Sequence, residues 1–384
     1  MPAHMESFWM DPAFFRTFLF CVFIAFAVAA LVQLIFFWGV FSRLAFYKKK
    51  QPPAAQKPVS IVICARNEYL HLKKNLPIIM DQEYPDFEVV VVNDSSDDDT
   101  EFLLKAFMEQ YPRLSVVHFR ENRNFFSGKK FPLALGIKSA KHDTILLTEA
   151  DCRPSSAFWL RNMQNAYSDS ANMVLGYSRI EQNKGLFDKM IRFDAVFRAM
   201  KYLSYAMAGM PYTGVGKNLS YTKTLFYKSK GFISHYTIRF GDDDLFVNRN
   251  ASALATRVEL SPESHTVSTT TYTFSRWVKK RKRQLTTARY YSKKHKFILG
   301  SFTMTQLLFY LCFIPLVIWK VELYIVLGLF GLRMASALIV FKRCMKTLHE
   351  QKLLLYLPLF ELMLVFLTPL LSLSASVVKQ DKWK

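Results

Sequence analysis

Long apolar runs stand near both ends of the chain, and between them short apolar runs alternate with amphipathic stretches. Residues 14–41 are almost wholly apolar, with Arg16 and Gln33 as the main interruptions, and residues 297–319 and 323–341 form two further runs. Each run is close to or longer than the roughly 20 residues that a helix needs to cross a bilayer. The pattern therefore predicts one membrane span near the N-terminus and at least two near the C-terminus.

The flanks of these runs indicate an orientation. Three lysines at 48–50 follow the first run, and basic residues at 342, 343 and 346 follow the third. Such residues mark the cytoplasmic side of a span, and the first run does not fit the short apolar region of a signal peptide. We therefore expect an integral protein of the cytoplasmic membrane with its central segment in the cytoplasm. A last run, residues 353–378, is broken by Pro358, Glu361 and Pro369, and the sequence leaves open whether it crosses, bends or re-enters.

The central segment carries strand and helix patterns in alternation. Apolar runs at 59–64, 89–92, 114–119 and 145–147 predict strands, and helical patterns at 72–79, 100–111 and 128–140 predict the helices between them. Such alternation indicates βαβ units, so we expect an α/β fold with a Rossmann-like, mostly parallel sheet. A later helix, expected over 185–207, is rich in Phe and Met and either faces the core or lines an acceptor site near the membrane.

These patterns divide the chain into five segments. Residues 1–50 form the N-terminal anchor, 51–57 a linker and 58–275 the α/β domain. Residues 276–296 are basic with interspersed aromatic residues, a composition typical of a helix on lipid headgroups, although a solvated linker is the alternative. Residues 297–384 form a C-terminal transmembrane region of two to three spans.

The composition narrows the choice of partners. The formal net charge is +21, yet 51% of the residues are hydrophobic and 35 are Phe, which is too apolar for a soluble basic domain. The basic residues cluster beside the membrane runs, a pattern that favours contact with membrane lipids and argues against a nucleic-acid partner. The five cysteines show no close pairs, so we expect a reducing compartment and neither disulfides nor a zinc site.

Two carboxylates follow the strand predicted at 145–147. If that strand continues, its period of two puts Glu149 and Asp151 on one face. Paired carboxylates at a strand end suit Mg²⁺ or Mn²⁺ carrying a diphosphate, and open α/β sheets bind ligands at that edge. A solvated turn with incidental acids is the alternative. A dehydrogenase is disfavoured because no Gly-X-Gly-X-X-Gly follows the first strand.

Six segments in order resemble the membrane-bound family 2 glycosyltransferases: PVSIVICARNE, VVVVNDSSDDDT, GKKFPLALGIKSA, DTILLTEADC, GVGKNLSYT and FGDDDLF. The resemblance spans residues 58–284, and the C-terminal runs are placed as in the polysaccharide-synthesising members. It implies a GT-A fold, which binds nucleotide sugars, and an inverting hexosyltransferase that uses Mg²⁺ or Mn²⁺. The implied donor is a nucleoside-diphosphate sugar, with UDP as the expected carrier. The expected acceptor is lipid-linked or a cell-envelope glycan.

The resemblance also assigns roles on the donor side. Asp151 is the first choice of metal ligand, and Glu149 stands where the family usually carries the first Asp of Asp-X-Asp. Lys129 matches the family's Gly-Lys and is expected to reach the diphosphate as a point charge. Residues that match the nucleotide-binding turns are Ala65, Asn67, Glu68 and Asp94, the last as the acceptor of a hydrogen bond from the base imide.

On the acceptor side, Gly241-Asp242-Asp243-Asp244 resembles the family's Gly-Glu-Asp. Because an attacking hydroxyl must lose a proton, Asp243 is expected to be the catalytic base, with Asp242 beside it in the catalytic pair. Gly216 and Asn218 resemble the acceptor-side segment of the fold.

The Gln-X-X-Arg-Trp signature of processive members is not intact in this chain, although Arg283 keeps its basic residue and is expected to bind the diphosphate. A transferase of single sugars is therefore expected. A processive polysaccharide synthase and an inactive nucleotide-binding membrane scaffold are the alternatives.

Overall fold

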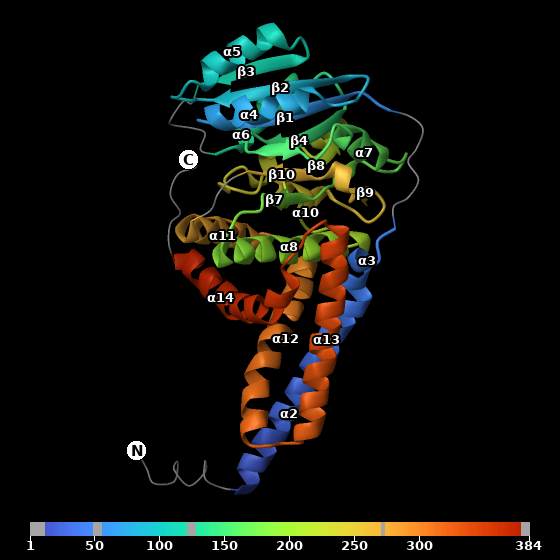
Figure 1. The fold of residues 1–384 in the computed structure, drawn as a ribbon, viewed down its shortest axis with the longest axis vertical. Coiled ribbons are helices and arrows are strands. Elements are labelled where there is room, and N and C mark those ends of the chain that lie inside the picture. The colour runs from blue at the N-terminus through green and yellow to red at the C-terminus, as the bar shows by residue number, and fades with distance from the viewer. Residues whose placement is uncertain (1–11, 49–55, 121–127, 270–272, 378–384) are drawn as a thin grey trace.

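The computed structural model describes residues 12–48, 56–120, 128–269 and 273–377, and Figure 1 shows two parts stacked along the long axis. An α/β domain lies at one end, and a bundle of long helices projects from the other. Residues 51–55 of the expected linker lie outside the described residues, as do the lysines at 49, 50, 379, 382 and 384.

The α/β domain is built on a sheet that begins with four parallel strands. They are β1 (Val59–Ala65), β2 (Phe87–Asp94), β3 (Leu114–Phe119) and β4 (Thr144–Glu149). β1 lies between β2 and β4, and β3 pairs with β2. Within the described residues the sheet continues through β8 (Leu219–Thr222), β6 (Met173–Leu175) and β9 (Thr256–Val258), with β8 antiparallel to both of its neighbours. The mostly parallel sheet expected from the sequence is confirmed.

Helices cover both faces of this sheet. On one face lie α4 (Tyr69–Met80), α5 (Thr100–Gln110) and α7 (Trp159–Asn165), and on the other lie α6 (Lys130–Ser139) and α8 (Leu186–Met207). Because both faces are covered, every residue of β1 and β2 is buried, which explains their unbroken apolar sequence. Gly136 lets α6 approach closely, since a Cβ there would lie 2.6 Å from Val92 and 2.8 Å from Val62.

The strand at Glu149 does not continue to Asp151, contrary to the sequence expectation. β4 ends at Glu149, and the chain turns through Ala150 and Asp151 into β5 (Cys152–Pro154), which belongs to a separate sheet. That small sheet has the order β5-β10-β7, with β10 (Thr266–Ser268) between β5 and β7 (Ser178–Ile180). Glu149 and Asp151 therefore do not share one face of a strand, because the turn changes the direction of the backbone between them.

Two helices lie crosswise between the sheet and the bundle in Figure 1: α8, and α11 (Phe274–Ala288). The basic stretch expected as one interfacial helix over 276–296 is divided, since α11 ends at Ala288 and α12 (Lys293–Ile318) begins before the stretch ends. Short helices complete the domain: α9 (Lys223–Lys228), η2 (Ile233–His235), α10 (Asp244–Asn250) and η3 (Pro262–Ser264).

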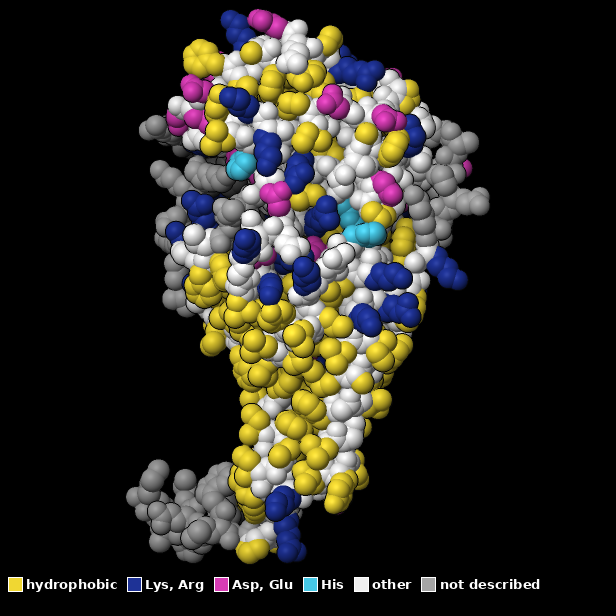
Figure 2. Space-filling model, in the orientation of Figure 1, with side chains coloured by type: hydrophobic (Ala, Val, Ile, Leu, Met, Phe, Trp, Pro, Cys, Tyr) yellow, Lys and Arg dark blue, Asp and Glu magenta, His cyan; other side chains and the backbone are white. Residues whose placement is uncertain are grey.

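The bundle contains helices long and apolar enough to cross a membrane. The first is α2 (Pro12–Ile35), which continues through a π-helical turn η1 (Phe36–Phe41) into α3 (Ser42–Ala45). It lies beside α12 and α13 (Leu323–Thr347), and Figure 2 shows apolar side chains over most of this part of the surface. An aromatic cluster fixes the domain to the bundle, because Phe41 contacts both Tyr205 of α8 and Phe302 of α12.

The last apolar run forms a short 3₁₀ helix η4 (Leu354–Tyr356) followed by α14 (Leu357–Val377). This segment also has the length and composition of a span. However, α14 lies obliquely at the domain end of the bundle in Figure 1, where it packs against α11. This oblique placement distinguishes α14 from α2, α12 and α13, which run along the axis of the bundle.

Polar residues inside the bundle pair with one another. Arg333 of α13 forms two hydrogen bonds with the Glu361 carboxylate of α14, one of 2.8 Å to Oε2. Gln306 donates to Glu361 at 2.7 Å, and Gln33 accepts from Arg333 at 3.1 Å. Gln33 and Glu361, which interrupt apolar runs in the sequence, therefore serve one buried network that ties α2, α12, α13 and α14 together.

Candidate active site

The candidate site lies at the carboxyl edge of the parallel strands. β1 ends at Ala65, β2 at Asp94 and β4 at Glu149, so the turns that follow converge at one edge of the sheet. Asn67 has a left-handed backbone, with φ of 55°, and its Oδ1 accepts from the Asp97 N–H at 2.8 Å. The β1 and β2 turns are thus held together by hydrogen bonds.

The residues matched to the nucleotide-binding turns lie along this edge. Ala65 and Asp94 are buried at the ends of their strands. Glu68 precedes α4, and its Oε2 lies 2.5 Å from His71 Nδ1. Because these residues come from neighbouring parallel strands, the structure brings them to the same edge as Glu149.

A cluster of acids and lysines lies at the end of β4. Lys129 Nζ is 3.1 Å from Glu149 Oε1 and 3.8 Å from Asp242 Oδ2. Lys217 Nζ is 3.3 Å from Glu149 Oε2 and 2.6 Å from Asp151 Oδ2. Lys217 therefore joins the two carboxylates that the turn in the chain would otherwise separate.

The charges in this cluster shift the pKa values of Glu149 and Lys129. Burial opposes ionisation of Glu149, but Lys129 and Lys217 outweigh it and lower its pKa to about 2. Burial likewise disfavours the charged form of Lys129, yet Glu149 and Asp242 raise the pKa of that lysine. Glu149 and Lys129 are consequently expected to be charged at neutral pH.

Glu149 and Asp151 supply some, but not all, of the oxygen ligands that a divalent metal ion needs. The described residues contain no group of three or more His, Cys, Asp or Glu side chains placed to hold an ion. However, Mg²⁺ and Mn²⁺ commonly take only one or two carboxylates and complete their shell with phosphate oxygens and water. Glu149 has a side chain 35% exposed, whereas that of Asp151 is 12% exposed and pairs with Lys217. Glu149 and Asp151 would therefore be the protein ligands of such an ion, with phosphate oxygens and water as its other ligands.

The three consecutive aspartates have different surroundings. Asp243 Oδ2 accepts from the Gly216 N–H at 2.9 Å, and its Oδ1 accepts from the Asp244 N–H at 2.7 Å. Burial and the charges of Asp242 and Asp244 raise the pKa of Asp243 to about 8. Asp244 accepts from the hydroxyls of Thr287 and Tyr291, and so ties α10 to α11. Asp243 is therefore the member of the three whose pKa is raised closest to neutral pH.

The two residues matched to the acceptor-side segment differ in what they contact. Gly216 supplies the N–H that holds Asp243. Asn218 is completely buried, where its Nδ2 donates to the carbonyls of Tyr177 and Ser264 and its Oδ1 accepts from Trp159. Asn218 thus braces the scaffold behind the site, and its side chain is fully engaged by the protein.

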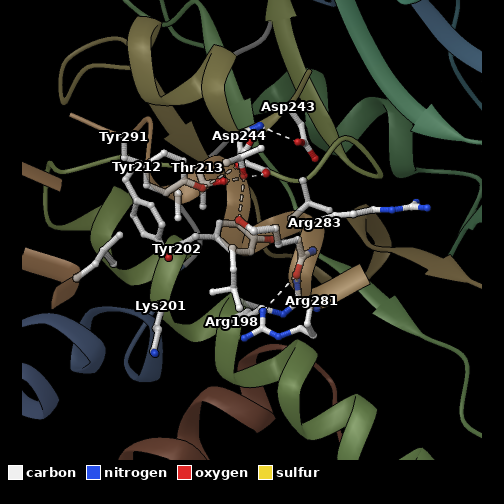
Figure 3. Close-up of a pocket in the computed structure, with 18 of the residues that line it drawn as sticks. Arg198, Lys201, Tyr202, Tyr212, Thr213, Asp243, Asp244, Arg281, Arg283 and Tyr291 are labelled. Carbon is white, nitrogen blue, oxygen red and sulfur yellow. Dashed lines mark hydrogen bonds between the residues drawn. The ribbon is translucent and has the colours of Figure 1, made fainter. Parts of the chain in front are cut away.

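One cavity of about 700 Å³ extends from the site to the long apolar helices. It is lined by Glu149, Lys217 and residues 240–244 at one end, and by Phe302, Thr368 and Ser372 of α12 and α14 at the other. Arg283 also lines it, with its guanidinium 5.3 Å from the Phe240 ring centre. Figure 3 shows Asp243 at the upper side of this cavity and Arg198 and Arg281 together at the lower side. The volume is that of a pocket for a small organic ligand.

Sequence patterns did not identify several residues of this cavity. Lys217 stands between Gly216 and Asn218 in a segment that was singled out, but nothing in that segment shows that its ammonium reaches Asp151. Arg198, Lys201 and Arg281 come from α8 and α11, and only tertiary packing brings them together. In the sequence, the only indication of Arg198 and Lys201 was that basic residues are interspersed in the helix expected over 185–207.

Comparisons with known proteins agree with this architecture. Residues 60–236 match the profile of glycosyl transferase family 2. The chain is 28% identical over 142 residues to a probable glycosyltransferase, YdaM, of Bacillus subtilis, which covers 36% of this chain and 34% of that protein. It is 27% identical over 111 residues to poly-beta-1,6-N-acetyl-D-glucosamine synthase of Staphylococcus epidermidis, covering 29% of this chain and 25% of that protein. The matches thus span about a third or less of these relatives.

A solved structure shows a similar fold over almost the whole chain. It is the mannosyltransferase PcManGT from Pyrobaculum calidifontis in complex with GDP-Man and Mn²⁺, with a TM-score of 0.57 and 16% identity, covering 94% of this chain and 98% of that one. At this identity the likeness concerns the fold. Together with the family match, it shows that residues 60–236 form a glycosyl transferase family 2 domain with a GT-A-like fold.

Proposed function

We propose that the protein is a membrane-bound inverting glycosyltransferase, which moves a hexose from a nucleoside-diphosphate sugar to a lipid-linked or cell-envelope glycan acceptor. The observation that carries the proposal is the single cavity lined by both Glu149 and Asp243. A donor diphosphate near Glu149 and an acceptor hydroxyl near Asp243 would share one enclosed space. UDP stays the expected carrier, on the family resemblance given by the sequence.

The proposed reaction is one displacement at the anomeric carbon. The acceptor oxygen forms a bond to that carbon while the bond to the diphosphate oxygen breaks, and the electron pair goes to the diphosphate. Asp243 takes the hydroxyl proton, and the Gly216 N–H holds its carboxylate in place. Attack from the side opposite the leaving group inverts the configuration.

Positive charge near the donor end would stabilise the departing diphosphate. Lys129 lies beside Glu149 and Asp242, and Arg283 lines the same cavity. Glu149 and Asp151 would hold a Mg²⁺ or Mn²⁺ ion, which when bound supplies further positive charge to the diphosphate. The nucleotide is proposed to lie along Ala65, Asn67, Glu68 and Asp94 at the strand edge.

The proposed location is the cytoplasmic membrane, with the catalytic domain in the cytoplasm. α12 ends and α13 begins at the end of the bundle far from the domain, so the domain-side ends of α2–α3, α12 and α13 lie together (Figure 1). Arg43, Lys293, Lys294, Arg343 and Lys346 all belong to these ends. This distribution supports a cytoplasmic domain by the positive-inside bias.

A direct test is thermal stabilisation of the purified full-length protein in a non-ionic detergent. UDP and GDP sugars would be screened with Mg²⁺, with Mn²⁺ and with EDTA. A ligand at about 100 times its Kd adds about 2.7 kcal/mol to the stability of the folded state, which is a readily measured shift in Tm. Nucleotide sugars that raise Tm would then be tested for release of the nucleoside diphosphate. A complete lack of stabilisation by every nucleotide sugar would contradict the proposal.

A processive polysaccharide synthase is a second candidate, favoured by the similarity to the synthase of Staphylococcus epidermidis. In this chain, Gln284 follows Arg283 at the position where the processive signature has Trp, and it accepts from Arg198 and Arg281. Product length separates the two candidates. Oligomers from a single binding event would support processive synthesis, and products with one added sugar would support the first proposal.

A further inference from the structure

Two arginines in the cavity pair with one carboxylate, on the side away from Asp243, and a lysine lies near them. Arg198 Nε of α8 is 3.4 Å from Asp194 Oδ2, and Arg281 Nε of α11 is 3.5 Å from the same oxygen. Lys201 follows Arg198 by three residues on α8, so it lies on the same face of the helix. We call Arg198, Lys201 and Arg281 the cation cluster. With Asp194 as its counter-charge, the cluster carries an excess of two positive charges.

Lys201 has no polar partner in the part of the chain that the structure describes. Its Nζ lies 4.5 Å from the Phe197 ring centre and 4.9 Å from that of Phe302, and the residue lines the cavity. Burial and the nearby Arg281 lower the pKa of Lys201 to about 8. The nearby Asp194 and Glu361 offset only part of this effect, so an anionic ligand in the cavity would stabilise the ammonium.

The surroundings of the cluster are partly membrane helices. Phe302, which Lys201 contacts, belongs to α12, and Thr303 and Met304 of the same helix line the cavity with Thr368 and Pro369 of α14. In Figure 3 the cluster lies on the side of the cavity away from Asp243. A ligand that reaches both would therefore place one group near the base and another near the cluster, with an apolar part toward the membrane helices.

We propose that the cation cluster binds the phosphate of an amphiphilic acceptor, whose apolar chain lies against α12 and α14. This inference rests on the proposed function, since it names the chemical class of the acceptor. Arginine and lysine together suit a phosphate ester, because guanidinium groups bind phosphate oxygens in pairs and an ammonium adds a point charge. The donor diphosphate has its own lysines, Lys129 and Lys217, at the opposite end of the cavity.

The experiment measures ligand-induced stabilisation of the full-length protein in a non-ionic detergent. The probes are a long-chain polyprenyl phosphate, the uncharged polyprenol of the same length, and inorganic phosphate. For the wild type we expect the polyprenyl phosphate to raise Tm at concentrations where the other two do not. An equal response to polyprenol would overturn the phosphate subsite, and an equal response to inorganic phosphate would overturn the amphiphile.

Lys201→Met is the informative variant, and Lys294→Met is its matched control. Both remove one lysine charge, but Lys294 is exposed in the first turn of α12 and does not line the cavity. We expect Lys201→Met to weaken polyprenyl phosphate binding by about 10- to 100-fold, as for the loss of a charge-assisted hydrogen bond. Lys294→Met should bind like the wild type. Equal weakening in both variants would mean nonspecific attraction to a basic surface and would overturn the proposal.

Two further measurements distinguish loss of the phosphate subsite from misfolding and from failure of the proposed function. Because Lys201→Met removes a charge that burial and Arg281 disfavour, its Tm without ligand should equal or exceed that of the wild type, whereas a structural lysine would lower Tm when lost. Stabilisation by a nucleotide sugar should be unchanged in Lys201→Met, and its loss would overturn the assignment to the acceptor. If nucleotide sugars fail with the wild type while polyprenyl phosphate still binds through Lys201, the proposed function fails and the phosphate subsite stands.

Discussion

Substitution of Asp243 by Asn should separate catalysis from stability. The amide is nearly the same size as the carboxylate, and its oxygen can still accept from the Gly216 N–H, as Asp243 does at 2.9 Å. It cannot take a proton from an acceptor hydroxyl. We therefore expect the transfer rate to fall by about 10²- to 10⁴-fold, the usual contribution of a positioned general base.

The same substitution should not destabilise the fold. A pKa raised from 3.8 to about 8 means that the folded protein disfavours the ionised carboxylate, at about 1.4 kcal/mol per pH unit. Because the side chain is partly exposed to the cavity, we expect about 1–2 kcal/mol of this cost to appear in the measured stability. Between pH 4 and 8 the folded state holds a proton that the unfolded state has lost, so wild-type stability falls as pH rises through this range. The neutral Asn variant lacks this fall.

The assay compares transfer rate, nucleotide-sugar affinity and Tm for three proteins. They are the wild type, Asp243→Asn and, as a matched control, Asp244→Asn. Asp244 accepts from Thr287 and Tyr291 between α10 and α11, so its substitution should lower Tm. Asp243→Asn should instead keep Tm and donor affinity while losing transfer. Transfer by Asp243→Asn within about tenfold of the wild type would refute its role as the base.

Three other predictions test the donor site, the pH dependence and the membrane network. Asp151→Ala should weaken nucleotide-sugar binding in Mn²⁺ but change it little in EDTA; titrations that show equal weakening in both would contradict a metal role. The transfer rate should rise about tenfold per pH unit and level off near pH 8, the pKa to which burial, Asp242 and Asp244 raise Asp243; a rate that is flat between pH 6 and 8 would speak against this base. Glu361→Leu should cost about 3–5 kcal/mol, because Arg333 is left buried without its carboxylate, and the double variant with Arg333→Met should recover much of the loss. Denaturation in detergent would measure this, and equal stabilities of the single and double variants would argue against the pairing.

The sequence patterns predicted the described fold well in elements where buried residues recur at regular intervals or in unbroken runs. β1 and β2 lie under helices on both faces, so their apolar runs were visible without knowledge of any neighbour. The helices α5 and α8 end within a residue of their expected limits. The apolar length of α2, α12 and α13 likewise matches the thickness of a bilayer.

The contacts within the candidate site could not be predicted from such patterns. Glu149 and Asp151 were correctly placed after a strand, but a turn separates them and Lys217 joins them. α14 was ambiguous because two prolines and Glu361 break its apolar run, and its oblique position depends on packing against α11 and on the ion pair with Arg333.

The sequence by itself determined the strands, the long apolar helices and the residue types at the strand ends, because each depends on periodicity and on short stretches of chain. Only the tertiary structure decided which charges meet. The contacts of Lys217 with Asp151, of Arg281 with Asp194 and of Arg333 with Glu361 join residues far apart in the sequence. Their strength depends on burial and on distances of a few ångströms, which no local pattern encodes.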